Sequence, residues 1–185
     1  LTNVKTRGTW GEVQLGTLLE QMLSPEQYAQ NVACKLGCAE RVEFAVKLPG
    51  QPGRDGEPVW LPIDAKFPVE DYQRMLDAQD RGDLAALDTA ARALEARIKA
   101  SARDIQSKYL DPPRTTDFAI MFLPTEGLYA EVLRKPGFAD SLQRDFRVLV
   151  TGPTTLGAVL NSLQMGFRIL TVEKRSSEVW QLLGA

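Results

Sequence analysis

The chain has 185 residues, 44% hydrophobic and 25% charged, with a formal net charge of −2. This composition is typical of one soluble domain with its own core, and it lacks the basic excess of proteins that coat duplex DNA, so contact with phosphate would need a local basic surface or a metal ion. The sequence has no histidine, which excludes Ser-His-Asp and Cys-His triads, zinc hydrolases and histidine-based acid–base catalysis.

The first helix is predicted to start at Thr9 and to end at Ser24-Pro25. Thr9 and Glu12 have the spacing of a capping box, in which the Glu12 carboxylate bonds the Thr9 amide and has only a structural role. A weak strand is predicted over residues 28–33. The two cysteines that follow, Cys34 and Cys38, lack the further Cys or His ligands of a closed zinc site, so we interpret them as half-buried thiols in a reducing cytoplasm.

Two segments of alternating hydrophobicity, residues 41–48 and 57–67, predict a pair of strands. The segment between them, residues 49–56, is rich in Pro and Gly and predicts a loop, so the strands most simply form an antiparallel hairpin. Pro62 has no amide hydrogen for a ladder bond. The second strand is therefore expected to have an edge or an irregularity at that position.

A turn at the centre of that loop would pair Glu43 with Asp64 and Lys47 with Trp60. Lys66, two residues beyond Asp64, then projects from the same face as both carboxylates. Facing carboxylates repel each other unless a cation neutralises them, and carboxylate oxygens favour Mg²⁺ or Mn²⁺. The structural alternative is a solvated strand face with an ordinary salt bridge.

Two helices are predicted next, over residues 68–79 and 84–109. The second has a nearly heptad apolar seam, which is typical of an amphipathic helix on a core or in a helical hairpin. Arg92, Lys99 and Arg103 form a separate stripe on it. Such a stripe is usually a solvated face, and it also fits contact with a phosphate backbone.

The remaining elements alternate between strand and helix, as in α/β proteins. A continuous apolar run over residues 118–123 predicts a strand buried on both faces. The others are helices at 125–134 and 137–144, a strand at 146–150 and a long final helix from residue 156.

Several short segments carry a family resemblance. They are Gly8-Thr9-Trp10-Gly11-Glu12, Arg41-Val42-Glu43 with Leu48-Pro49, Ile63-Asp64-Ala65-Lys66, Lys108-Tyr109, Phe122-Leu123-Pro124-Thr125-Glu126 and Gly152-Pro153-Thr154-Thr155. In this order and over nearly the whole chain, they resemble the RmuC family of bacterial DNA recombination proteins.

The resemblance implies an α/β fold of the restriction-endonuclease-like PD-(D/E)xK class, with a mixed sheet flanked by helices and with long amphipathic helices. Asp64 and Lys66 match the acidic residue and lysine of the (D/E)xK motif. Glu43 stands where the motif has Asp, and Glu12 matches the acidic residue of the first helix. The longer Glu43 side chain brings catalysis, but not the fold, into question.

The implied activity is cleavage of DNA phosphodiesters with Mg²⁺ or Mn²⁺ held by Glu43, Asp64 and Glu12 and with Lys66 beside the attacking water. We expect four further residues to position the DNA backbone, namely Arg41, Lys47, Lys108 and Gln30. Two alternatives remain open: a catalytically silent DNA-binding domain of the same fold, and an interaction scaffold built on the long helices.

The sequence begins at Leu1, and its last helical pattern still continues at Ala185. We therefore expect residues 1–185 to be one domain of a longer protein, whose coiled coil, implied by the resemblance, would provide contacts with further copies or with other recombination proteins. No window resembles a signal peptide and no apolar run is long enough to span a bilayer. We expect a cytoplasmic domain, with any inner-membrane anchor outside these residues.

Overall fold

The structure is a computed structural model that describes the backbone of residues 3–48 and 58–183 and the side chains of residues 10–48 and 58–168. The predicted loop over 49–56 lies outside the described residues. The helices and strands follow in chain order: α1 (Asn3–Met22), a 3₁₀ turn (Pro25–Gln27), β1 (Tyr28–Val32), β2 (Val42–Leu48), β3 (Val59–Ala65), α2 (Val69–Asp80), α3 (Leu84–Tyr109), β4 (Ala119–Phe122), α4 (Glu126–Arg134), α5 (Phe138–Phe146), β5 (Val148–Thr151) and α6 (Pro153–Leu183).

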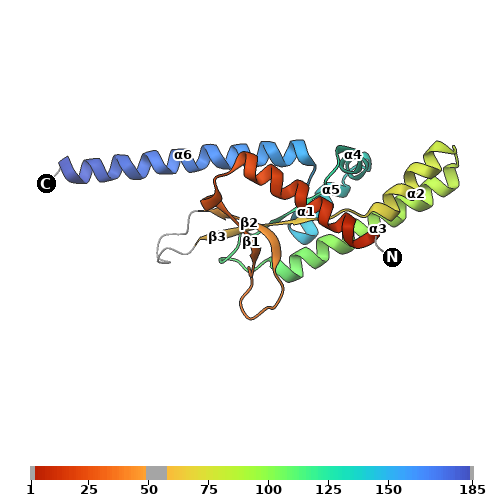
Figure 1. Ribbon diagram of the computed structural model, residues 1–185, viewed down its shortest axis with the longest axis horizontal. Coiled ribbons are helices and arrows are strands. Elements are labelled where there is room, and N and C mark those ends of the chain that lie inside the picture. Colours follow the sequence, from red (N-terminus) through yellow and green to blue (C-terminus); the bar gives the residue numbers. More distant parts are fainter. Residues whose placement is uncertain (1–2, 49–57, 184–185) are drawn as a thin grey trace.

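The five strands form one mixed sheet in the order β1-β2-β3-β4-β5. Figure 1 labels the first three of these strands. The β1–β2 and β2–β3 pairs are antiparallel, and the β3–β4 and β4–β5 pairs are parallel. The hairpin register is the predicted one, because Lys47 pairs with Trp60 and Phe44 pairs with Ile63. The α/β class with a mixed sheet flanked by helices is therefore confirmed.

Pro62 lies in the middle of the sheet, and the sheet accommodates it by an interruption. The parallel pairing of β3 with β4 starts only at Ile63. Before that point, the contact on this side is a single bridge between Trp60 and Thr115. Pro62 therefore needs no amide hydrogen for β4, and the predicted irregularity is confirmed.

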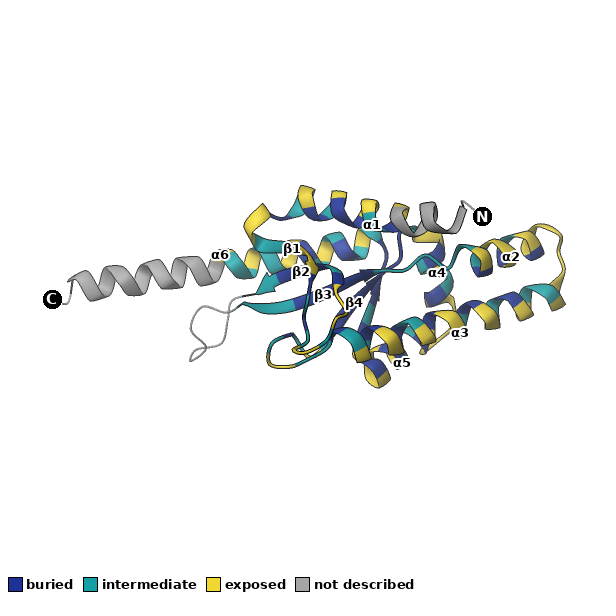
Figure 2. Cartoon of the chain, turned by 60° about the horizontal axis from the view of Figure 1, so that its bottom comes forward, coloured by how far each residue is buried: buried dark blue, intermediate teal, exposed yellow. Residues whose placement is uncertain are grey.

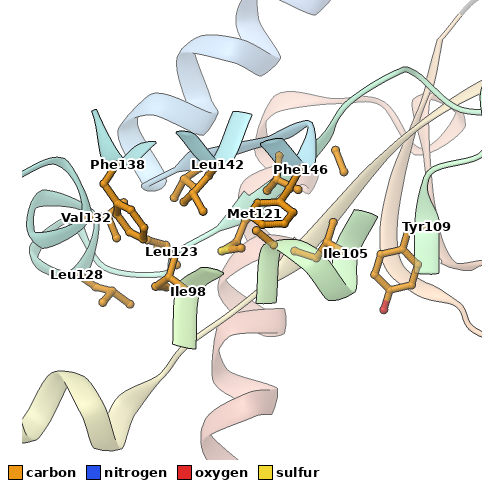
Figure 3. Close-up of a cluster of buried hydrophobic side chains, with 14 of the residues drawn as sticks. Ile98, Ile105, Tyr109, Met121, Leu123, Leu128, Val132, Phe138, Leu142 and Phe146 are labelled. Atoms are coloured by element: carbon orange, nitrogen blue, oxygen red, sulfur yellow. The ribbon is translucent and has the colours of Figure 1, made fainter. Parts of the chain in front are cut away.

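Helices cover both faces of the sheet (Figure 2). On one face, α1 and α6 pack against odd-numbered β3 residues, such as Leu61 and Ile63, in a core that includes Leu15 and Leu156. On the other face, α3, α4 and α5 pack around Met121 (Figure 3). The strand alternation decides which side chain enters which core.

The seam of α3 is part of this second core. Its inward residues are Ala90, Leu94, Ile98, Ala102, Ile105 and Tyr109, all of which are buried. The bounds of α3 are those predicted, and the Asp83 carboxylate accepts a hydrogen bond from the Ala86 amide at 3.0 Å as its N-cap. Within the described residues, the near-heptad pattern therefore represents the core face of an amphipathic helix.

The predicted capping box at Thr9 and Glu12 is wrong. Helix α1 begins at Asn3, so its first turn lies well before Thr9 and the chain is already helical there. A capping box is found instead at the 3₁₀ turn, where the Ser24 amide donates to the Gln27 side chain at 2.9 Å. The Glu12 carboxylate is consequently not used as a helix cap.

Two of the family-like segments meet at the start of α6. Glu126 Oε1 accepts a hydrogen bond from the Thr154 amide at 2.6 Å, across 28 residues of sequence. Gly152 lies beneath this contact, and an added Cβ there would come within 2.9 Å of Glu126 Oε2. The segments at 122–126 and 152–155 therefore serve the fold, because Glu126 of the first segment caps α6, which begins within the second.

Cys34 and Cys38 are free thiols; Cys38 is half-buried as predicted, whereas Cys34 is fully buried in the core. Burial raises the pKa of Cys34 to about 11, so this thiol stays protonated. Among the helices whose residues the structure describes, none combines the length and the apolar character that crossing a membrane requires.

Candidate functional site

The predicted carboxylates and lysine come together at the end of the hairpin. Continuing the observed register by one residue sets Glu43 of β2 opposite Asp64 of β3. Glu43 Oε2 accepts a hydrogen bond from the Ala65 amide at 3.3 Å, and Lys66 Nζ lies 2.7 Å from Asp64 Oδ2. The Lys66 amide donates to the Phe122 carbonyl at 2.9 Å, which fixes the backbone just after β3 ends.

Asp64 is fully buried, with 0% of its surface exposed. Neither oxygen of its carboxylate accepts a well-directed hydrogen bond from the described residues. The Lys66 ammonium forms an ion pair with Oδ2, and the Tyr109 hydroxyl interacts with the carboxylate as a hydrogen-bond donor of poorer geometry. Burying a carboxylate in this way is costly unless charges or further donors compensate. The site therefore retains unused acceptor capacity next to Glu43, which suits a divalent cation.

Burial and charge set the protonation of Glu43 and Lys66. Burial, and then the negative charge of Asp64, raise the pKa of Glu43 to about 7, against a lowering effect of Lys66. Burial alone would lower the pKa of Lys66, but attraction by Asp64, Glu43 and Asp104 raises it on balance. Lys66 is thus a cation at neutral pH, while Glu43 is close to its titration point.

Tyr109 is also part of this site, which was not predicted from the sequence. It is the last residue of α3 and is 7% exposed, and its hydroxyl is turned away from the apolar cluster (Figure 3). Burial, and then the carboxylates of Asp64, Glu43 and Glu40, raise the pKa of its phenol. Tyr109 therefore stays protonated and keeps a hydrogen-bond donor near Asp64. Its occurrence in the Lys108-Tyr109 segment was the available sequence signal.

Helix α1 brings Glu12 to the same place from the opposite side of the sheet. The Trp10 ring lies 5.4 Å from the Phe67 ring, and Gly11 is buried next to Pro124 and Ala65. Glu12 faces the cavity beside Glu43, and its charge contributes to the raised pKa of Glu43. The four predicted catalytic residues, Glu12, Glu43, Asp64 and Lys66, are therefore neighbours.

An open cavity of about 430 Å³ lies against this group. Its walls come from five elements: α1, β2, the end of β3, the first turn of α2, and α3. The lining includes Glu12, Glu43, Lys66, Asp71 and Arg97. Asp71 and Arg97 were not predicted as site residues, because they come from separate helices that only the folded chain brings together.

A second open hollow, of about 330 Å³, shares Glu12 and Glu43 with the first. It contains the predicted DNA contact Gln30, which is exposed on the edge strand β1. The described residues that line it also include Thr17, Glu20 and Asn31. The carboxylates of Glu12 and Glu43 thus form the wall between two hollows.

The other three predicted DNA contacts are not among the described residues that line either hollow. Arg41 donates from Nη1 to the Asn31 carbonyl at 2.9 Å. Lys47 Nζ lies 6.0 Å from the centroid of the Trp60 ring, and Lys108 is half-buried near the end of α3. Their role in DNA binding stays a prediction.

A metal ion would find a sparse ligand set here. No group of three or more His, Cys, Asp or Glu residues in the described part of the chain is arranged to hold one. Mg²⁺, however, keeps several waters and is commonly held by one or two carboxylates together with substrate phosphates. The adjacent carboxylates of Glu43 and Asp64, with acceptor capacity left on Asp64, fit that requirement.

Known proteins of one family match this chain along its whole length. The profile of the RmuC family matches residues 1–185. A "DNA recombination protein RmuC homolog" of Xylella fastidiosa (strain Temecula1) is 60% identical over 185 residues, which cover 100% of this chain and 40% of the relative. Proteins of the same description from Chlamydia pneumoniae and Pseudomonas aeruginosa are each 28% identical, over 97% and 100% of this chain respectively and 40% of each relative. The chain thus spans about 40% of the length of these curated relatives. No solved structure matches it. The chain belongs to the RmuC family.

Proposed function

We propose that this domain is a Mg²⁺- or Mn²⁺-dependent phosphodiesterase that acts on DNA, with an architecture of the restriction-endonuclease-like PD-(D/E)xK class. The observation that carries the proposal is the group formed by Asp64, Lys66 and Glu43 at the end of one hairpin, with Lys66 Nζ 2.7 Å from Asp64 Oδ2. The relatives described as DNA recombination proteins make DNA the expected partner.

Glu43 and Asp64 would hold the cation, with Glu12 as a further carboxylate from α1. When bound, such an ion polarises a phosphoryl oxygen and lowers the pKa of a coordinated water. The residues of the chain do the rest. The raised pKa of Lys66 keeps an ammonium at the rim of the cavity, where it stabilises negative charge that develops on a phosphate. Tyr109, behind Asp64, would orient that carboxylate as a positioning residue.

A catalytically silent DNA-binding domain is the second candidate. It is favoured by the glutamate at position 43, whose extra methylene shifts the carboxylate relative to Lys66, and by the absence of a three-ligand cluster among the described residues. This candidate retains the cavity and its charges but requires no turnover.

The test is incubation of the purified chain with linear and branched DNA in Mg²⁺, in Mn²⁺ and in chelator. The proposal predicts cleavage that needs the metal and that both Asp64→Asn and Lys66→Met abolish. Asp80→Asn, an exposed change at the last residue of α2, serves as the control and should cut normally. Cleavage that survives both site substitutions would exclude this site. Binding without cleavage by any variant would support the silent domain.

A further inference from the structure

The cavity beside the candidate site is lined by a second cationic side chain, to which the proposed chemistry assigns no role. Arg97 of α3 lines it together with Lys66, Glu12 and Glu43. The Arg97 side chain is 67% exposed, whereas its partner Asp71 has only 10% of its side chain exposed. An exposed guanidinium is therefore fixed to a nearly buried carboxylate at the edge of the cavity.

Asp71 binds two arginines at once. Its Oδ2 lies 3.3 Å from Arg97 Nε, and its Oδ1 lies 3.1 Å from Arg74 Nη1. Because each carboxylate oxygen has its own arginine, the orientation of both guanidinium groups is restricted. Arg97 uses Nε in this contact. Its two terminal nitrogens form no hydrogen bond or ion pair with another described residue. A guanidinium held in this way is pre-organised for a phosphate, which its planar fork binds in bidentate fashion.

The charge around the site is asymmetric. The hollow on the other side of Glu12 and Glu43 has no lysine or arginine among its described lining residues, and it adds the carboxylate of Glu20. Of these two hollows, only the cavity bounded by α2 and α3 has cations among its described lining residues, namely Lys66 and Arg97. The carboxylates of Glu70 and Asp71 line it as well. A DNA strand that crosses Glu43 would therefore have its phosphate held on the α2–α3 side only.

We propose that Arg97, clamped by Asp71, binds a backbone phosphate of the DNA strand next to the phosphate that faces Lys66. This inference rests on the proposed function, because it assumes that DNA occupies the cavity. It adds to that site a phosphate-binding residue, Arg97, and a carboxylate, Asp71, that holds it in place. It also assigns the DNA strand to the α2–α3 side of Glu43. A purely structural role, in which the network of Arg74, Asp71 and Arg97 only ties α2 to α3, makes a different prediction for salt dependence.

The experiment measures binding of a fluorescently labelled DNA oligonucleotide at several salt concentrations, in the presence of Ca²⁺ in place of Mg²⁺. Removal of one phosphate contact lowers the slope of log affinity against log salt by about 0.7 for a single strand or 0.9 for a duplex. Arg97→Gln should show that drop, together with an affinity about tenfold weaker. Arg97→Lys, which keeps the charge but loses the fork, should lie between Arg97→Gln and the wild type.

Arg134→Gln is the matched control. Arg134 of α4 is also an exposed guanidinium paired with a largely buried carboxylate, that of Glu131 at 2.8 Å, but it does not line this cavity. The inference predicts a wild-type slope for this variant. An unchanged slope in Arg97→Gln would overturn the inference and leave the proposed function intact. An equal drop in Arg97→Gln and in the control variant would have the same meaning. Wild-type protein that binds no DNA would overturn the proposed function and this inference together.

Discussion

Lys66 Nζ lies 2.7 Å from Oδ2 of Asp64, and this ion pair joins a side chain that is 35% exposed to one that is 1% exposed. The lysine is the charge nearest to a carboxylate that has no well-directed hydrogen bond from the described residues. The pair has two consequences. The charge of Asp64 depends on Lys66 for its compensation, and a divalent cation would be a second means of compensation.

Lys66→Met should therefore destabilise the metal-free protein. Methionine keeps the aliphatic packing but leaves Asp64 as an uncompensated buried charge. Removing a partner from a fully buried pair costs about 3–5 kcal/mol, and because Lys66 is partly exposed we expect about 2 kcal/mol. The free energy of unfolding in urea measures this loss, and added Mg²⁺ should restore part of it. Lys99→Met, on the exposed face of α3, is the control. A variant as stable as the wild type without metal would refute the dependence of Asp64 on Lys66.

Glu43→Gln should change the pH dependence of stability. The folded-state pKa of Glu43, about 7, is above its ordinary value of 4.5, so the folded protein binds this proton more tightly than the unfolded chain does. The stabilising contribution is fully present below pH 4.5 and is lost as the pH rises to about 7. Glu43→Gln, which cannot ionise, should be more stable than the wild type at pH 8 by about 1–2 kcal/mol and nearly equal to it at pH 5. Urea unfolding without metal at both pH values tests this. A constant difference between the two proteins across this range would contradict the assignment.

Tyr109→Phe should separate binding from folding. The ring stays packed in the core beneath α3, so the free energy of unfolding should fall by at most about 1.5 kcal/mol. Loss of the hydroxyl near Asp64, in contrast, should weaken Mn²⁺ binding about tenfold. Tyr28→Phe is a suitable control, because Tyr28 packs against Phe44 on the other face of the sheet. If titration calorimetry gave equal Mn²⁺ affinities for Tyr109→Phe and the wild type, Tyr109 would have only a packing role.

Glu126→Ala should act on the fold alone. It removes the carboxylate that accepts the Thr154 amide at the start of α6, and loss of a helix cap costs about 1 kcal/mol. Thermal unfolding measures the effect, and Mn²⁺ affinity should stay at the wild-type value. A fall in Mn²⁺ affinity without loss of stability would show that this segment belongs to the site and not only to the fold.

The sequence was most informative where contacts are local. The pairing of Glu43 with Asp64 follows from strand alternation and a short connection, so the register could be predicted correctly. The burial of Asp64, the approach of Tyr109 and the clamp between Asp71 and Arg97 could not be predicted. They depend on how α2 and α3 pack against the sheet, and neither periodicity nor spacing encodes that packing.

The start of α1 was mispredicted for a related reason. Thr9 and Glu12 have the local pattern of a helix start, but α1 continues through them from Asn3. Local capping preferences are worth only about 1 kcal/mol, so a longer helix that packs on the core can override them. Because α1 does not start at Thr9, Glu12 has no capping role, and its side chain lines the cavity instead.

Mn²⁺ binding followed by electron paramagnetic resonance tests whether Glu43 and Asp64 hold a divalent cation. We predict that the wild-type protein and Asp80→Asn bind Mn²⁺, and that Asp64→Asn and Glu43→Gln, although folded, lose this binding. Equal Mn²⁺ binding by all four proteins, or none by the wild type, would show that these two carboxylates do not form a cation site.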